Sequence, residues 1–214
     1  MASKAIRRSQ THGEELANTI SHGVGALLAL AGAAPLAVRG AMTGSAKTAF
    51  SLAAYGASLV LLYTASAVYH AVRSPAAKRV LRVMDHCSIF VLILGTYIPM
   101  SLLVVGGQTG WLLFLTNTTL AVIGITLNAI DLKRFDKLSL ALYALMGWLI
   151  VVALRAIVAA LPPLGLGLLV AGGVAYTAGI VFYKSQRRYM HFVWHLFVLA
   201  GSILQYACIA LYCI

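Results

Sequence analysis

The stretch YMHFVWHLFVLAGSILQYACIALYC, residues 189–213, contains no Asp, Glu, Lys or Arg. About 20 apolar residues suffice for a helix to cross the hydrocarbon layer of a bilayer, so this stretch predicts a membrane-spanning helix. Six further stretches of similar character precede it, separated by short breaks with polar or turn residues. The seven predicted spans are approximately 16–38, 48–72, 82–105, 109–130, 138–161, 164–183 and 189–213.

The composition agrees with an integral membrane protein. Hydrophobic residues make up 61% of the 214 residues, charged residues only 10%, and the mean hydropathy is +0.91. The breaks are too short to separate domains, so we expect one all-α domain, a seven-helix transmembrane bundle over residues 1–214. Charged residues precede the first apolar stretch, which we expect to be retained as an anchor rather than cleaved as a signal peptide.

Basic residues are distributed very unevenly between alternate connections. One group of connections holds thirteen Lys and Arg residues and the other group only Arg39 and Lys47. The positive-inside rule places the richer group in the cytoplasm, which predicts a cytoplasmic amino terminus and an external carboxyl terminus. Because the basic residues are scattered through short loops, they do not indicate nucleic-acid binding.

Polar residues recur where four of the predicted spans meet the cytoplasmic boundary. Charges and imidazoles at such positions are costly without partners and mark functional sites. His191 and His195 are four residues apart at the start of the last span, and Ser66 and His70 have the same spacing at the end of the second. Asp85 and His86 open the third span. The first span contributes Glu15, Asn18 and His22 at its cytoplasmic end.

A metal site is the chemistry that this layer of histidines and carboxylates most naturally serves. Two histidines at i and i+4 can both reach one ion at about 2.0–2.1 Å, and three protein ligands with an open fourth position are usual for catalytic zinc. The pair alone is a weak signal, and it lacks the glutamate of the H-E-x-x-H pattern.

Simpler interpretations stay open for each group. His191 and His195 are also consistent with interfacial histidines that bond headgroups or backbone carbonyls. Asp85 has Arg82 three residues before it as an ion-pair partner, and His86 is more typical of a surface or outer residue than of a ligand. Glu15 and Asn18 are equally compatible with capping of the first helix.

Four motifs in order resemble one known family. They are GEELANTISHGVG at 13–25, SAVYH at 66–70, MDHCSIFVLILGTYIP at 84–99 and YMHFVWHLFVLAGS at 189–202. Their combination is similar to the bacterial haemolysin III branch of the progestin and adipoQ receptor family. The resemblance implies a multi-pass protein of the bacterial cell (inner) membrane, with seven helices and a cytoplasmic amino terminus.

The resemblance also implies a zinc site. His70, His191 and His195 would be the ligands, Asp85 would contact the zinc-bound water, and Ser66 would lie nearby. Glu15, Asn18, His22 and His86 would support the ligands from outside. Because the family is similar to alkaline ceramidases, the resemblance suggests a zinc-dependent hydrolase of a lipid amide or ester in membrane lipid homeostasis, with Asp85 as general base and Ser66 as oxyanion donor.

Two further classes of function remain possible at this point. The first is a non-enzymatic sensor or receptor-like regulator that binds a membrane lipid and uses zinc structurally. The second is the pore-forming haemolysin that the family name suggests, although an uncleaved protein of seven spans has no evident soluble form with which to attack another cell. A retinal protein is disfavoured, because the last span has no lysine for a Schiff base.

Overall fold

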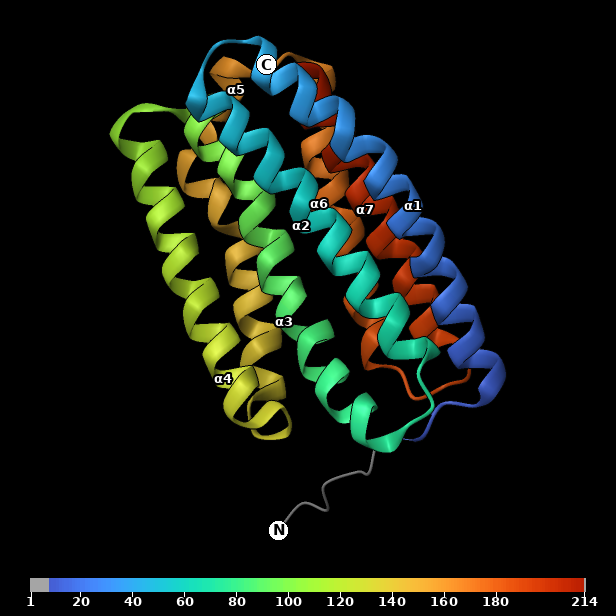
Figure 1. Cartoon of the computed structure of the whole chain (residues 1–214). Coiled ribbons are helices and arrows are strands. Elements are labelled where there is room, and N and C mark those ends of the chain that lie inside the picture. Colours follow the sequence, from blue (N-terminus) through green and yellow to red (C-terminus); the bar gives the residue numbers. More distant parts are fainter. Residues whose placement is uncertain (1–7, 214) are drawn as a thin grey trace.

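The computed structural model describes residues 8–213, and every regular element in that range is helical. Lys4 and Arg7, which enter the charge count, and Ile214, the predicted external end, lie outside the described residues. The elements are α1 (His12–Met42), α2 (Ala46–Ala71), α3 (Pro75–Pro99), η1 (Met100–Val105), α4 (Gly107–Trp148), η2 (Leu149–Ala153), α5 (Leu154–Ala160), α6 (Pro163–Lys184) and α7 (Met190–Tyr212). The long helices pack side by side as a bundle (Figure 1). The prediction of an all-helical fold is confirmed.

The helical segments are long and apolar enough for a multi-pass membrane protein. Six segments of the described chain qualify by length and composition, with mean hydropathies between 1.5 and 2.2. Large apolar side chains such as Leu27, Val152 and Val181 point outward and are 68%, 76% and 70% exposed. Such a surface is stable against lipid chains rather than water, which agrees with the predicted class.

Two helices, α1 and α3, begin at least four residues earlier than the hydropathy indicated. α1 begins at His12 because Thr11 caps it: the Thr11 hydroxyl accepts the Glu14 N–H, and the Glu14 carboxylate accepts the Thr11 N–H. The alternative that Glu15 and Asn18 form this cap is therefore wrong.

α3 begins at Pro75, where the Ser74 side chain accepts the Ala77 N–H and proline is tolerated in the first turn. Asp85 and His86 therefore lie well inside α3. The prediction from the sequence that they begin this helix is wrong. Hydropathy marks only the part of a helix that suits hydrocarbon, whereas the cap determines where the helix begins.

α4 folds back on itself at Asp131, whose backbone is extended (φ −157°, ψ 91°) within an otherwise helical run. Asn117 donates to the Met146 carbonyl at 3.4 Å, although a straight helix would separate these residues by roughly 40 Å. The ribbon accordingly reverses at the end of its yellow-green section (Figure 1). The predicted loop at 131–137 is therefore only one residue long, Asp131. The Asp131 carboxylate accepts the N–H groups of Lys133 and Arg134, which caps the returning helix and lets it begin at once.

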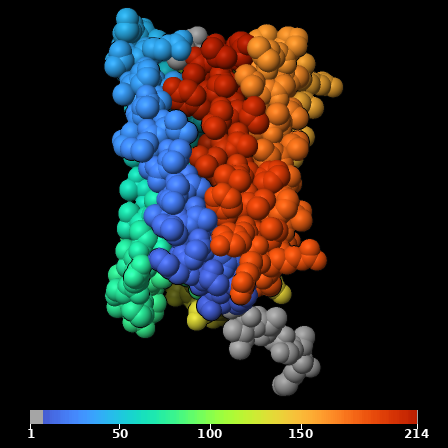
Figure 2. All heavy atoms as spheres, turned by 90° about the vertical axis from the view of Figure 1, so that its right-hand side faces the viewer, coloured from blue at the N-terminus to red at the C-terminus, as the bar shows by residue number. Residues whose placement is uncertain are grey.

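The elements that carry the candidate histidines are neighbours. α1, α7 and α6 lie side by side on one face of the bundle (Figure 2), and α2 packs against α1. The first turns of α1 and α7 and the last turn of α2 lie at the same end of the bundle (Figure 1). Polar residues from helices far apart in the sequence therefore meet in one layer.

Candidate metal centre

Three histidines from two helices converge at this end of the bundle. His70 is in the last turn of α2, and His191 and His195 occupy the first turns of α7. One ring nitrogen from each lies within 4.8 Å of the others, and within residues 8–213 no other set of His, Cys, Asp or Glu side chains is grouped in this way. His70 and His195 are buried and His191 is half-buried. The three imidazoles therefore share one small volume.

The imidazole of His70 is oriented by residues of α1. Its Nδ1 lies 2.6 Å from Glu15 Oε2 and 3.4 Å from Asn18 Nδ2. A carboxylate only accepts hydrogen bonds, so Nδ1 carries the proton and Nε2 has a free lone pair. Nε2 is buried and has no hydrogen-bond partner among the described residues. A histidine held by a carboxylate through one nitrogen, with the other left open, is the usual arrangement of a metal ligand.

His195 is oriented in a comparable way by Ser21. Its Nδ1 lies 3.1 Å from Ser21 Oγ, and the same hydroxyl donates to the Asn18 carbonyl at 2.9 Å. Since a hydroxyl has a single proton, Ser21 Oγ must accept from the protonated Nδ1 of His195. The lone pair of His195 is therefore on Nε2.

His22 packs directly against this group of histidines. Its ring stacks on His195 with centroids 3.5 Å apart and planes 8° apart, and it forms a T-shaped contact with Tyr63 with centroids 5.0 Å apart. Both ring nitrogens of His22 are buried without a hydrogen-bond partner in the described part of the chain. His22 therefore contacts His195 through the face of its ring.

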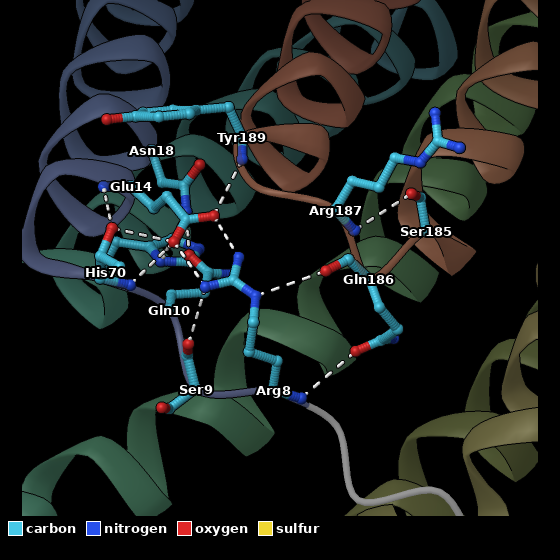
Figure 3. A network of polar contacts seen from close by, with 11 residues as sticks. Arg8, Ser9, Gln10, Glu14, Asn18, His70, Ser185, Gln186, Arg187 and Tyr189 are labelled. Atoms are coloured by element: carbon cyan, nitrogen blue, oxygen red, sulfur yellow. Dashed lines mark hydrogen bonds and ion pairs between the residues drawn. The ribbon is translucent and has the colours of Figure 1, made fainter.

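A strap of chain at residues 8–11 crosses the same end of the bundle (Figure 3). Arg8 forms an ion pair with the buried carboxylate of Glu14 and donates through Nε to the Gln186 carbonyl at 3.3 Å. Glu14 also accepts the Tyr189 N–H at 2.8 Å. Tyr189 is the only non-glycine residue in 8–213 with a left-handed backbone (φ 61°). Glu14 thus ties the strap to the turn from which α7 begins.

Beneath the strap lies a small cavity of about 60 Å³ that reaches His191. This volume is sufficient for water molecules beside the histidines. Its lining is polar and comes from the strap, from α1, and from the end of α6 and the start of α7: Arg8, Gln10, Glu14, Tyr183, Ser185, Gln186, Arg187 and His191.

Asp85, His86 and Ser66 are placed less directly. The Asp85 carboxylate lies 3.5 Å from His86 Nδ1. It does not belong to the group of atoms within 4.8 Å of one another that His70, His191 and His195 form in the described part of the chain. His86 Nδ1 lies 2.9 Å from the Arg82 carbonyl. Ser66 is buried one turn before His70 on α2. The roles assigned to these residues from the sequence stay predictions.

Two residues that position the site escaped the sequence analysis. Ser21 has no distinguishing pattern around it, because its role depends on how α1 packs against α7. Glu14 does have a local signal, since Thr11 and Glu14 form the T-x-x-E pattern of a capping box. That pattern predicts a helix start, although it gives no indication of the bond to Tyr189.

The chain is similar to proteins of one family over nearly its whole length. A family model described as "Haemolysin-III related" matches residues 10–206. A protein named Hemolysin-3 from Bacillus cereus is 37% identical over 213 residues, which cover 99% of this chain and 97% of that protein. A Hemolysin-3 homolog from Bacillus subtilis (strain 168) is 38% identical over 202 residues, covering 94% and 95%. The chain therefore belongs to the haemolysin-III-related family.

Proposed function

We propose that this protein is a zinc-dependent hydrolase of a lipid amide or ester bond in the bacterial inner membrane. The observation that carries the proposal is the group of three histidines, two of which have one nitrogen held by α1 and the other left with a free lone pair. Three imidazoles without a fourth ligand among residues 8–213 match catalytic zinc sites, which keep one position open, better than structural sites with four protein ligands.

The proposed topology has seven spans with the histidines near the cytoplasmic face. The 54-residue segment Gly107–Ala160 folds back at Asp131, and each of its two legs is long enough to cross the bilayer. Counting both legs raises the six segments to seven. The thirteen-to-two distribution of basic residues then supports a cytoplasmic amino terminus and an external carboxyl terminus.

In this proposal the side chains divide the work of hydrolysis. Bound zinc would lower the pKa of a water molecule toward about 7 and polarise the scissile carbonyl. Asp85 accepts the proton of the water that attacks the carbonyl carbon, and returns it to the departing amine or alcohol when the C–N or C–O bond breaks. Ser66 donates a hydrogen bond to the oxygen on which negative charge develops.

A lipid substrate fits the placement of the site. The histidines lie at the ends of helices whose outer surfaces are apolar, so a lipid can approach laterally with its chains in the hydrocarbon. The polar cavity beside His191 has room for water, the second reactant of hydrolysis. Hydrolysis at such a site would act in membrane lipid homeostasis.

The test separates hydrolysis from zinc binding. Protein purified in detergent with zinc is incubated with lipid amides and esters, and Asp85→Asn is compared with the wild type. We expect turnover to fall by roughly 10²- to 10⁴-fold while zinc is retained, because only the general base is removed. Turnover unchanged in Asp85→Asn would refute this mechanism. A zinc-loaded wild type that hydrolyses none of these lipids would instead support a sensor with structural zinc.

A further inference from the structure

α1 supplies none of the three grouped histidines, yet one of its faces contacts two of them. Glu15 and Asn18 lie against His70, and Ser21 and His22 lie against His195. These four positions share one face of a helix, because their spacings are three, three and one. One face of α1 therefore contacts and orients His70 of α2 and His195 of α7.

The contacts of Ser21 and His22 with His195 restrain different motions. The hydrogen bond from Nδ1 to Ser21 Oγ decides which nitrogen is protonated, but a ring held by one bond can still swing about that bond. A ring stacked at 3.5 Å with nearly parallel planes blocks the swing, because any tilt of His195 would bring the two rings into collision.

His22 also contacts a second ring. The planes of His22 and Tyr63 meet at 89°, and the Tyr63 hydroxyl donates to Ser202 Oγ on α7 at 2.7 Å. Tyr63 can approach α1 only because residue 25 is glycine: a Cβ there would lie 2.5 Å from Tyr63 Cδ1. A column of contacts thus runs from Gly25 through Tyr63 and His22 to His195.

We propose that His22 is a positioning residue of the metal centre, which keeps Nε2 of His195 aimed at the ion through the stacked face of its ring. The proposal rests on the zinc site of the proposed function. It extends that site by assigning a role to a fourth histidine, which is not one of the three grouped nitrogens. Since both nitrogens of His22 lack partners in 8–213, the structure assigns the contact to the ring face.

The first test replaces His22 and measures metal binding without any substrate. Zinc affinity is determined by competition with a chelator for His22→Ala and His22→Phe. We expect His22→Ala to bind zinc about 10- to 100-fold more weakly, the usual effect of losing a residue that orients a ligand. His22→Phe preserves a flat ring, so its affinity should stay close to that of the wild type. The visible spectrum of bound Co²⁺, which reports coordination geometry, should change only in His22→Ala.

The second test perturbs the column from its far end. Gly25→Ala should displace Tyr63 and lower zinc affinity, whereas Gly23→Ala is a matched control on the same helix because a Cβ there has no atom within 4 Å. Equal affinities for these two variants would contradict the column of contacts.

Two results would overturn the role of His22 itself. Wild-type affinity and spectrum in His22→Ala would remove any positioning role. A His22→Phe protein as weak as His22→Ala would show that a nitrogen, rather than the ring face, is needed. A wild type that binds no zinc or Co²⁺ would refute the metal site, and with it the proposed function, which is a different result from either of these.

Discussion

Two groups of buried polar residues lie among the apolar helices, and they differ in how completely their atoms are paired. Between the two legs of α4, Ser139 donates to Asn128 Oδ1 at 2.6 Å, and Asn128 donates to the Tyr143 hydroxyl at 3.4 Å. The Tyr143 hydroxyl in turn donates to the His86 carbonyl on α3 at 2.8 Å. Each of these side chains bonds to another group of the bundle.

The histidine group contains polar atoms that are unpaired in the described part of the chain, and is called the open group here; the side chains of the α4 group are paired, and form the closed group. His70 is fixed at Nδ1, yet its Nε2 is buried and has no partner among the described residues. Buried polar atoms are nearly always paired. The unpaired Nε2 of His70 belongs to a group of three histidines that could hold a metal ion, and such an ion would pair it. Polar residues therefore hold helices together in the α4 group, whereas in the histidine group they orient imidazoles that could hold a metal ion.

Removing a histidine should have the largest effect of any change in either group. We expect His70→Ala to lose about one equivalent of zinc per chain, because two of three protein ligands rarely retain the ion. Ser139→Ala, in the closed group, should retain zinc fully. Metal analysis of the detergent-purified proteins measures both. Equal zinc content in the wild type and His70→Ala would break the distinction between the two groups.

The adjacent acids Glu14 and Glu15 sharpen the comparison at a finer scale. Glu15→Gln removes the charge that holds His70 and leaves Lys78 without its ion-pair partner, so zinc affinity should fall about 10- to 100-fold. Glu14→Gln is the companion variant: Glu14 bonds to Arg8, Thr11 and Tyr189 rather than to His70, so its zinc affinity should fall less than that of Glu15→Gln. Chelator competition gives the affinities, and an equal loss in both variants would show only that negative charge matters at this end of the bundle.

The sequence predicted those parts of the site that depend on local periodicity. His191 and His195 share a helix face because they are four residues apart, and apolar composition was sufficient to identify helices. Convergence of His70 with them required only that successive helices cross the membrane in opposite directions, so that polar ends gather at one face. The family resemblance named the same three histidines, and the structure groups them.

Other features depend on packing that no local pattern records. The bond between Ser21 and His195 joins residues 174 positions apart, and Tyr63 can lie beside His22 only because residue 25 is glycine. The start of α3 was misplaced because Ser74 and Pro75 begin a helix that is first polar and only later apolar. The sequence predicted the position of the reversal in α4 correctly. It did not predict that the connection is a single residue, because that depends on the capping bonds of Asp131.

The smallest expected effect comes from the closed group, and it tests whether polar pairs there serve stability alone. Ser139→Ala removes the donor to Asn128 Oδ1 and should lower the free energy of unfolding by about 0.6 kcal/mol, and by no more than about 1.7 kcal/mol, as is usual for hydrogen bonds between membrane helices. Thr119→Ala is a suitable control, because the Thr119 hydroxyl bonds to the Leu115 carbonyl of its own helix. Unfolding in mixed micelles measures both variants, with zinc content determined in parallel. A Ser139→Ala protein that lost zinc as well as stability would show that the α4 hairpin supports the metal site through Tyr143 and α3. In that case the α4 group and the histidine group would depend on each other. Complete pairing of polar atoms would then no longer distinguish residues that serve stability from residues that serve metal binding.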